Sequence, residues 1–339
     1  MNIRSVHYIH FVYCIRLPVT ALILCAGALP LAAVAQPAAQ AYPNKAIRMI
    51  VTFPAGGGVD FMGRIIGQKL SERIGQQVVI DNRGGSNGII GLQALMASPA
   101  DGYTIASSSA GPLAVNPHVY PKLPYDTLRD FTLIARGVDF PLLLLTHPSL
   151  PVKNVKDLIA LAKARPGELT CASSGAGNAD HLASELFKSM AKITMIHVPY
   201  KGSGPTAIAL LSGEVQLMFS SIPPTLAHIR AGKMRALGVG NAKRIPSQPD
   251  FPTIAESGLP GYEAYSWGGI VGPAKMPAEV VQKLNREINE VLKSKDAVDR
   301  FLAGGTIPVP ATPEEFSTLI TSEIKKWGAV ARAANIRAD

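Results

Sequence analysis

The residues best suited to chemistry in this chain are three consecutive glycines in a single turn. The turn, residues 53–60 (FPAGGGVD), follows a strand-like run at 46–53 and precedes a run with helical spacing. Glycines leave backbone N–H groups bare at the start of a helix, where these groups and the helix dipole attract anions. The turn therefore predicts capture of a small anion rather than catalysis.

Other turns that follow predicted strands are also rich in Gly, Ser and Pro. They are residues 107–111 (SSSAG), 172–181 (ASSGAGNADH), 199–202 (PYKG) and 219–221 (FSS). Ligands of open α/β sheets bind beyond the carboxyl ends of the strands. We therefore expect these turns to converge on one ligand.

A secreted hydrolase is the alternative, because Ser108 or Ser173 could be paired with His181 or His197. The sequence has no zinc-ligand spacing, and no Walker lysine follows the glycines. The segment at 84–91 (GGSNGIIG) lacks the spacing of a dinucleotide-binding loop. We therefore predict no enzymatic activity, no catalytic residue, no cofactor and no metal.

The elements that must position these turns alternate between strand and helix patterns. One series runs from 46 to 107, a second from 131 to 239, and a return strand at 262–272 precedes two amphipathic helices. Such alternation predicts an α/β fold with right-handed crossovers. About 300 residues are more than one hydrophobic core usually serves, so we expect two lobes. Each lobe should be an open, mostly parallel sheet with helices on both faces, and two extended hinge segments should join the lobes.

The first 35 residues have the features of a signal peptide. Arg4 and Arg16 are their only charges, an apolar run spans 17–34, and small residues at 33–35 suit a signal peptidase. Pro18 and Pro30 interrupt the run, which disfavours the alternative of a membrane anchor. We expect a mature chain from near Gln36, exported to the periplasm.

Export simplifies the cysteine and charge inventory. Cys14 and Cys25 leave with the signal peptide, so the mature protein keeps Cys171 and forms no internal disulfide. The net charge of +9 loses two positive residues and becomes +7. Because Lys and Arg are scattered rather than striped, we expect small anions and not nucleic acid as partners.

The chain resembles the extracytoplasmic solute receptors of the tripartite tricarboxylate transporter family, often called Bug receptors. Matching stretches include YPNKAIRMIVTFPAGGGVD, VVIDNRGGSNGIIG, SPADGYT, ASSGAGNADHLASELFK, HVPYKGSGP and FPTIAESGLPGYEAYSW. They run in family order across nearly all of residues 42–335. The resemblance implies a two-lobed periplasmic binding protein of type II-like fold, with lobe one at 42–141 plus 264–339 and lobe two at 142–263.

The resemblance and the turns together indicate the ligand-binding residues. In the first lobe they are Phe53, Pro54, Gly56, Gly57, Asp60, Ser107, Ser108 and Trp267. In the second lobe they are Ser173, Ser174, Gly175, Gly177, Asn178, Pro199, Tyr200, Lys201, Gly202 and Phe219. Fixed N–H groups and hydroxyls at two facing helix entrances, one per lobe, would hold a carboxylate without burying an opposite charge.

Several of these residues have a structural alternative. Asp60 could cap its own helix, and His181 and His197 could have packing roles. Lys201 could lie in a solvated turn or anchor a diacid. Trp267 could pack in the hinge or stack on the ligand. The chain also departs from the family pattern at residues 55 and 59 and at 178–180. The added charge of Asp180 would disfavour a second carboxylate on its side unless it faces solvent.

The function that follows is capture of a small organic carboxylate by closure of two lobes, and its delivery to a tripartite tricarboxylate-type membrane transporter. A receptor that reports its ligand to a membrane sensor kinase is the alternative, because both uses need the same closure. We expect the protein to be a monomer.

Overall fold

The structure, a computed structural model, describes residues 42–333 and residue 336. The predicted signal peptide therefore lies outside the described residues. The strands are β1 (Ile47–Val51), β2 (Val78–Asn82), β3 (Thr104–Ser109), β4 (Phe131–Thr146), β5 (Thr170–Ser173), β6 (Ile196–Pro199), β7 (Leu217–Ser221), β8 (Arg235–Val239), β9 (Tyr265–Pro273) and β10 (Ile307–Pro308).

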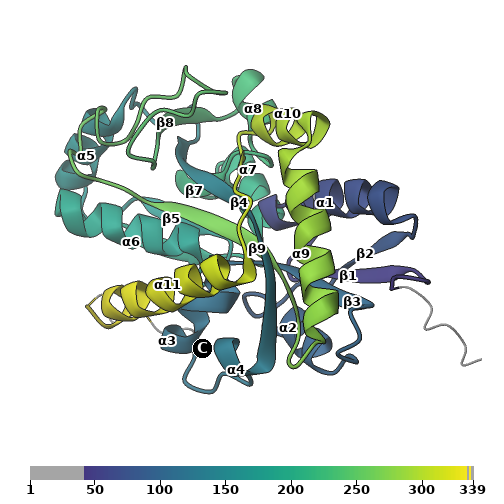
Figure 1. Cartoon of the computed structure of the whole chain (residues 1–339). Helices are drawn as coiled ribbons and strands as arrows, with labels where there is room; N and C mark the ends of the chain where they lie inside the picture. The colour runs from purple at the N-terminus through teal and green to yellow at the C-terminus, as the bar shows by residue number, and fades with distance from the viewer. Residues whose placement is uncertain (1–41, 334–335, 337–339) are drawn as a thin grey trace, which may run out of the picture. The chain divides into compact units, whose positions relative to one another are not determined.

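Helices alternate with these strands over most of the chain, as Figure 1 shows. They are α1 (Gly58–Ile74), α2 (Ile89–Met96), the π-helical turn η1 (Gly111–Val115), α3 (Asn116–Val119), α4 (Thr127–Asp130), α5 (Val155–Ala164), α6 (Ala179–Ala191), α7 (Ser203–Ser212), α8 (Leu226–Arg230), α9 (Ala278–Lys293), α10 (Lys295–Ala303) and α11 (Pro313–Ala333). The α/β class predicted from the alternating pattern is confirmed.

The strands form two half-sheets that share β4. The first half-sheet has the order β2-β1-β3-β9-β4, with β10 also on β4. The second has the order β4-β7-β5-β6, with β8 also on β4. The 16-residue strand β4 pairs with β9 as far as Pro141 and with β7 from Leu142 onward.

The half-sheets are mixed, whereas we expected mostly parallel ones. Strand β1 is parallel to β2 and β3, and β5 is parallel to β6 and β7, as βαβ crossovers require. Strand β9 is antiparallel to β3 and β4, and β4 is antiparallel to β7 and β8. Each antiparallel pair among the described strands includes β4 or β9, the two long connecting segments, which run in opposite directions.

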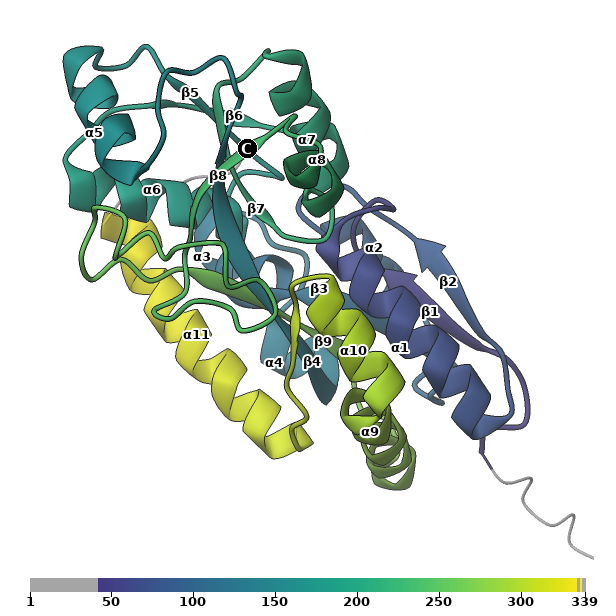
Figure 2. The same ribbon diagram turned by 90° about the horizontal axis from the view of Figure 1, so that it is seen from above.

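Each half-sheet is covered by helices on both faces, as the view from above shows (Figure 2). On the first half-sheet, α1 and α9 pack on one face with Met62 and Ile288 in the core, and α2 and α11 pack on the other with Leu92 and Phe316. On the second, α5 and α6 cover one face, and α7 and α8 cover the other. This layering leaves the strand-to-helix turns at the edges where the half-sheets meet.

Helix boundaries follow local signals in the sequence. The side chain of Asn154 accepts a hydrogen bond from the Asp157 amide, 2.9 Å, and so caps α5. Thr312 and Glu315 bond reciprocally at the start of α11, a capping box. Helix α1 ends at Gly75, whose φ of 69° lies in the left-handed region that glycine adopts without strain.

Candidate functional site

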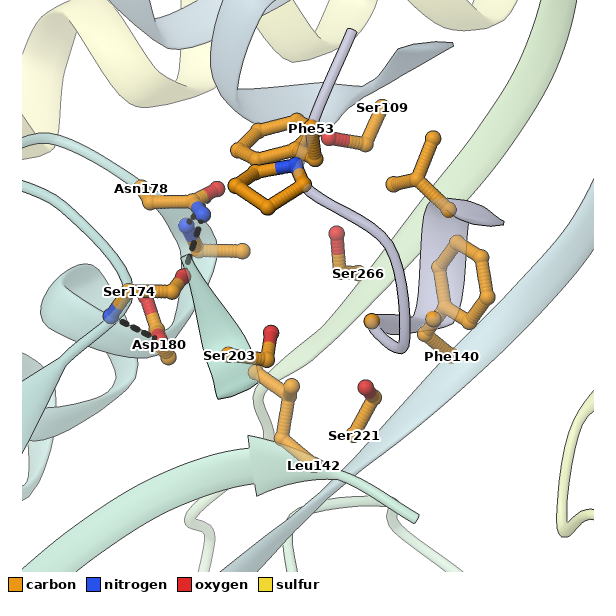
Figure 3. Close-up of a pocket in the computed structure, with 15 residues that line it drawn as sticks. Phe53, Ser109, Phe140, Leu142, Ser174, Asn178, Asp180, Ser203, Ser221 and Ser266 are labelled. Atoms are coloured by element: carbon orange, nitrogen blue, oxygen red, sulfur yellow. Dashed lines mark hydrogen bonds between the residues drawn. The ribbon is translucent and has the colours of Figure 1, made fainter. Parts of the chain in front are cut away.

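The first turns of three helices line one cavity between the half-sheets. Figure 3 shows the side chains that line it. The cavity is partly open to solvent, and its empty space including this opening is about 510 Å³. The residues that line it are Phe53, Pro54, Gly57, Gly58, Val59, Ser109, Phe140, Leu142, Ser174, Asn178, Ala179, Asp180, Ser203, Ser221 and Ser266. The first turns of α1, α6 and α7 all contribute, whereas we expected two helix entrances.

The entrance of α1 supplies bare amides because glycine is required there. A Cβ atom on Gly58 would lie 2.9 Å from Ser221 Oγ and 3.2 Å from the Phe140 ring. The first intrahelical bond is donated by Phe61 to the Gly57 carbonyl, 2.9 Å. In the described part of the chain, the amides of Gly58 and Val59 have no protein acceptor, so both can donate to an anion in the cavity.

The entrance of α7 faces that of α1 at close range. A Cβ atom on Gly57 would lie 3.6 Å from Ser203 Oγ, and one on Gly202 would lie 3.1 Å from Pro54. Gly202 is the N-cap of α7, and its φ of 104° favours glycine. Since α1 belongs to the first half-sheet and α7 to the second, donors from both converge here.

Asp60 does not line the cavity, but its side chain stabilises the turn that precedes α1. Its carboxylate accepts hydrogen bonds from the Gly56 amide, from Arg64 and from Asn82, each 2.9 Å long. Burial alone would raise the pKa of Asp60, but these donors and the Arg64 charge lower it below its usual value. Asp60 is therefore ionised and holds the exposed Gly56 in place.

The entrance of α6 is occupied by its own side chains. Asn178 Oδ1 accepts from the Ala179 amide, 2.9 Å, and Asn178 Nδ2 donates to Ser174 Oγ, 2.6 Å. Asp180 accepts from the Ser174 amide, 2.6 Å, and from the His181 amide, 2.9 Å. Burial raises the pKa of Asp180 in spite of these donors. This entrance offers fewer free donors than those of α1 and α7.

Four serines that we did not select reach the cavity: Ser109, Ser203, Ser221 and Ser266. Ser109 and Ser221 are the last residues of β3 and β7, in turns that the sequence indicates. The alternation of side chains along a strand predicts that Ser109 lies on the same face as Ser107. Ser107, on the same face of β3, instead donates to the Val59 carbonyl beneath α1, 3.1 Å. No pattern in the neighbouring sequence predicts that Ser266 reaches the cavity, because the strands that pair with β9 are distant in sequence.

Other predicted site residues lie away from this cavity. Phe219 packs between Phe187 and Tyr262 in the second core. Trp267 is 1% exposed, and its indole donates to Glu323, 3.2 Å, and contacts Phe316 edge-on. Ser108 accepts from Thr52 Oγ1, 3.2 Å, in the interior of the first half-sheet. Gly177 donates to the His181 ring, 3.0 Å.

The PYKG turn lines a neighbouring cavity that shares three residues with the first. These shared residues are Phe53, Pro54 and Ser174. Only the second cavity is lined by residues 85–88 and by Gly175, Pro199, Tyr200, Lys201 and Gly202. Residues 84–88 (GGSNG) match the G-x-S-x-G spacing of hydrolases, but no His, Asp or Glu lines this cavity to activate Ser86.

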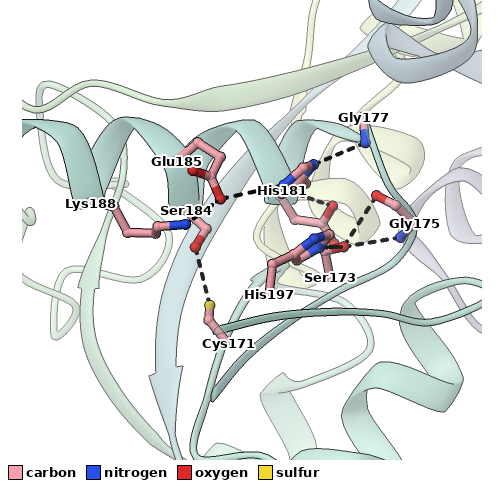
Figure 4. A network of polar contacts seen from close by, with 10 residues as sticks. Cys171, Ser173, Gly175, Gly177, His181, Ser184, Glu185, Lys188 and His197 are labelled. Carbon is pink, nitrogen blue, oxygen red and sulfur yellow. Dashed lines mark hydrogen bonds and ion pairs between the residues drawn. The ribbon is translucent and has the colours of Figure 1, made fainter. Parts of the chain in front are cut away.

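A buried polar network connects the two predicted histidines (Figure 4). The rings of His181 and His197 stack with centroids 3.7 Å apart, and His197 Nε2 lies 2.6 Å from Ser173 Oγ. Ser173 is 0% exposed and does not line the cavity, so its hydroxyl is not presented to a substrate. Within residues 42–333 and 336, no group of three or more metal-ligating side chains could hold an ion.

A family model described as the tripartite tricarboxylate transporter family receptor matches residues 62–336. The chain belongs to this receptor family. The family and the fold predicted from the sequence are therefore confirmed, and the protein is a solute receptor rather than an enzyme.

Relatives of this receptor match over most of its length. BugT of Bordetella pertussis is 41% identical over 295 residues, which are 87% of this chain and 90% of BugT. A solved R. palustris structure with adipate has a TM-score of 0.86 at 38% identity, covering 88% of this chain and all of that one. The structure of MatC from Rhodopseudomonas palustris with bound malate has a TM-score of 0.80 at 28% identity, covering 85% and 99%.

None of the helices in the described range is long and apolar enough to cross a membrane. Solved neighbours include periplasmic binding protein BugD, with a TM-score of 0.83 at 29% identity, covering 88% of this chain and 100% of that chain. The receptor thus has the fold of periplasmic binding proteins.

Proposed function

We propose that this receptor captures a small organic carboxylate in the cavity between α1, α6 and α7 and delivers it to a tripartite tricarboxylate-type membrane transporter. The observation that carries the proposal is that the bare amides of α1 face the entrance of α7 across a cavity whose described lining residues include serines but no Lys or Arg. Several fixed donors stabilise a carboxylate without a buried cation. The relatives with adipate and malate support this ligand class.

We further propose that residues 42–141 plus 264–339 and residues 142–263 act as two lobes that close on the ligand. The change of β4 from one half-sheet to the other at Pro141 and Leu142 supports this division. The receptor would work in the periplasm after removal of residues 1–35. Mass spectrometry of the mature protein from its host should find an N-terminus near Gln36.

The function is tested by thermal shift and calorimetry with a panel of organic mono-, di- and tricarboxylates. A ligand at 100 times its dissociation constant should raise the free energy of unfolding by about 2.7 kcal/mol. Binding should occur without turnover of the ligand, as chromatography of the recovered acid would show. A panel in which amines or sugars bind and carboxylates do not would contradict the proposal.

The variant Gly57→Leu tests the position of the site in the same assay. A side chain there points toward Ser203 and fills the space between the two entrances, so carboxylate binding should fall at least about a hundredfold, or about 2.7 kcal/mol. The melting temperature without ligand should change little, because Gly57 has an ordinary negative φ of −87°. Ala55→Leu, on an exposed residue of the same turn, is the matched control and should bind normally.

A further inference from the structure

Asp180 is the one ionisable side chain among the described residues that line the cavity. It is the second residue of α6 and is 6% exposed. Figure 3 shows it beside Ser174 and Asn178, on the side of the cavity formed by the second half-sheet. A buried carboxylate at the edge of a site for anions needs a reason, because like charges repel strongly where water is excluded.

The hydrogen bonds of Asp180 make it an acceptor. The Ser174 amide donates to Oδ2, 2.6 Å, and the His181 amide donates to Oδ1, 2.9 Å. Backbone amides can only donate, so both bonds favour the ionised carboxylate and oppose the burial that raises the pKa of Asp180. A carboxylate has about four lone-pair sites, so Asp180 retains acceptor capacity beyond its bonds to Ser174 and His181.

No Lys or Arg among the described lining residues neutralises this charge. The Asn178 amide group already donates to Ser174 Oγ, 2.6 Å. Lys201 lines the neighbouring cavity and not this one. The cavity is therefore polarised: donors gather at the entrances of α1 and α7, and an unneutralised acceptor lies at the entrance of α6.

We propose that Asp180 sets the ligand class: the receptor selects carboxylates that carry a hydrogen-bond donor, such as a hydroxyl, amide or ammonium group, at the end remote from the carboxylate. A second carboxylate at that end would be repelled. This inference rests on the proposed function, because it assumes that the first carboxylate binds at α1 and α7. It narrows the ligand from any organic acid to donor-ended acids.

Calorimetry with length-matched acids on the mature protein tests the inference. One set contains adipate, its monoamide, 6-hydroxyhexanoate and 6-aminohexanoate, and shorter sets are built on glutarate and succinate. The proteins are wild type, Asp180→Asn and Asp157→Asn. Asp157 is a matched control because it is a first-turn carboxylate of α5 that accepts a backbone amide, from Lys153 at 2.9 Å, away from the cavity.

The expected result is that, at the best length, at least one donor-ended acid binds about tenfold or more tightly than the diacid, as a like-charge contact requires. Asp157→Asn should keep this difference in affinity. Asp180→Asn should reduce it to less than about threefold, because the diacid should bind more tightly to that variant. If Asp180→Asn fails to fold, the order of affinities of these acids for the wild-type protein decides whether donor-ended acids are preferred.

Three results would overturn the inference, and they are distinguishable. A diacid that binds wild type as tightly as every donor-ended acid refutes the selectivity but leaves carboxylate capture standing. A tenfold gap that persists in Asp180→Asn refutes the role of this residue. Failure of every acid to bind any of the three proteins removes the proposed function as well.

Discussion

Two stacked imidazole rings support the turn that carries Ser174 and Gly175. His181 Nδ1 accepts from the Gly177 amide, and its Nε2 lies 3.4 Å from Glu185. His197 is buried against His181 and bonds to Ser173. Burial, and then the proximity of His181, lower the pKa of His197 from 6.5 to about 4. Protonation of His197 would place a charge against the stacked ring.

This depressed pKa predicts a pH-dependent loss of stability. In the unfolded chain His197 takes up a proton near pH 6.5, whereas in the folded protein it does so near pH 4, so folding is stabilised above pH 6.5 and that contribution is lost as the pH falls to 4. The melting temperature of wild type should fall across this window more steeply than that of His197→Gln.

The control for this prediction is His147→Gln, because His147 lies on a surface turn and bonds to Ser149. It should keep the slope of wild type between pH 6.5 and pH 4. Parallel melting curves for wild type and His197→Gln over the same pH range would show that His197 is not protonated differently in the two states.

At the scale of the element, the entrance of α1 depends on a carboxylate outside the cavity. Asp60 binds the Gly56 amide ahead of the N-cap and the Asn82 side chain on β2. The Arg64 side chain that it also contacts is largely exposed, so that ion pair contributes little. The buried bonds of Asp60 therefore set the conformation in which Gly58 and Val59 present their amides.

Asp60→Ala should loosen this turn. Loss of the carboxylate removes an acceptor from the Gly56 amide and leaves Asn82 Nδ2 with the Phe53 carbonyl, which should lower the free energy of unfolding by about 1 kcal/mol in urea titrations. Carboxylate binding should weaken as well, because the donors of α1 are no longer held in place. Glu72→Ala, at the exposed far end of α1, should change neither property. A normal affinity in Asp60→Ala would show that the turn keeps its shape without this residue.

At the scale of the whole molecule, the two half-sheets are connected through β4 and β9, and their turns meet at α1 and α7. A Cβ atom built on Gly57 lies 3.8 Å from the Cβ atom of Ser203. That separation equals the mean for disulfides. A bond there would link residues that we assign to different lobes.

The double variant Gly57→Cys with Ser203→Cys should therefore lock the lobes together. Oxidised and without ligand, it should have the radius of gyration of the ligand-saturated wild type in small-angle X-ray scattering, whereas ligand-free wild type should be larger. Cys171 is buried and should not exchange with the new pair. Each single variant is a control that should keep the radius of ligand-free wild type under the same oxidising conditions. A wild type whose radius does not respond to ligand would contradict the two-lobe closure.

The sequence by itself determined the features that depend on neighbouring residues. The caps at Asn154 and Thr312 and the end of α1 at Gly75 use bonds within one turn of the chain, so residue type and spacing determine them. The glycine turn at 53–60 was identified for the same reason. The family resemblance then extended these local features to the α/β fold.

Only the tertiary structure decided which side chains reach the cavity. Ser266 lines it and Trp267, the next residue, is buried against Phe316, because the pairing of β9 with strands far away in sequence sets the face on which each lies. The antiparallel pairs, the third helix entrance at Ser203 and the burial of Asp180 also depend on contacts between distant segments. Residue type and spacing encode the local turn, but the direction in which a strand is paired is a property of the whole sheet.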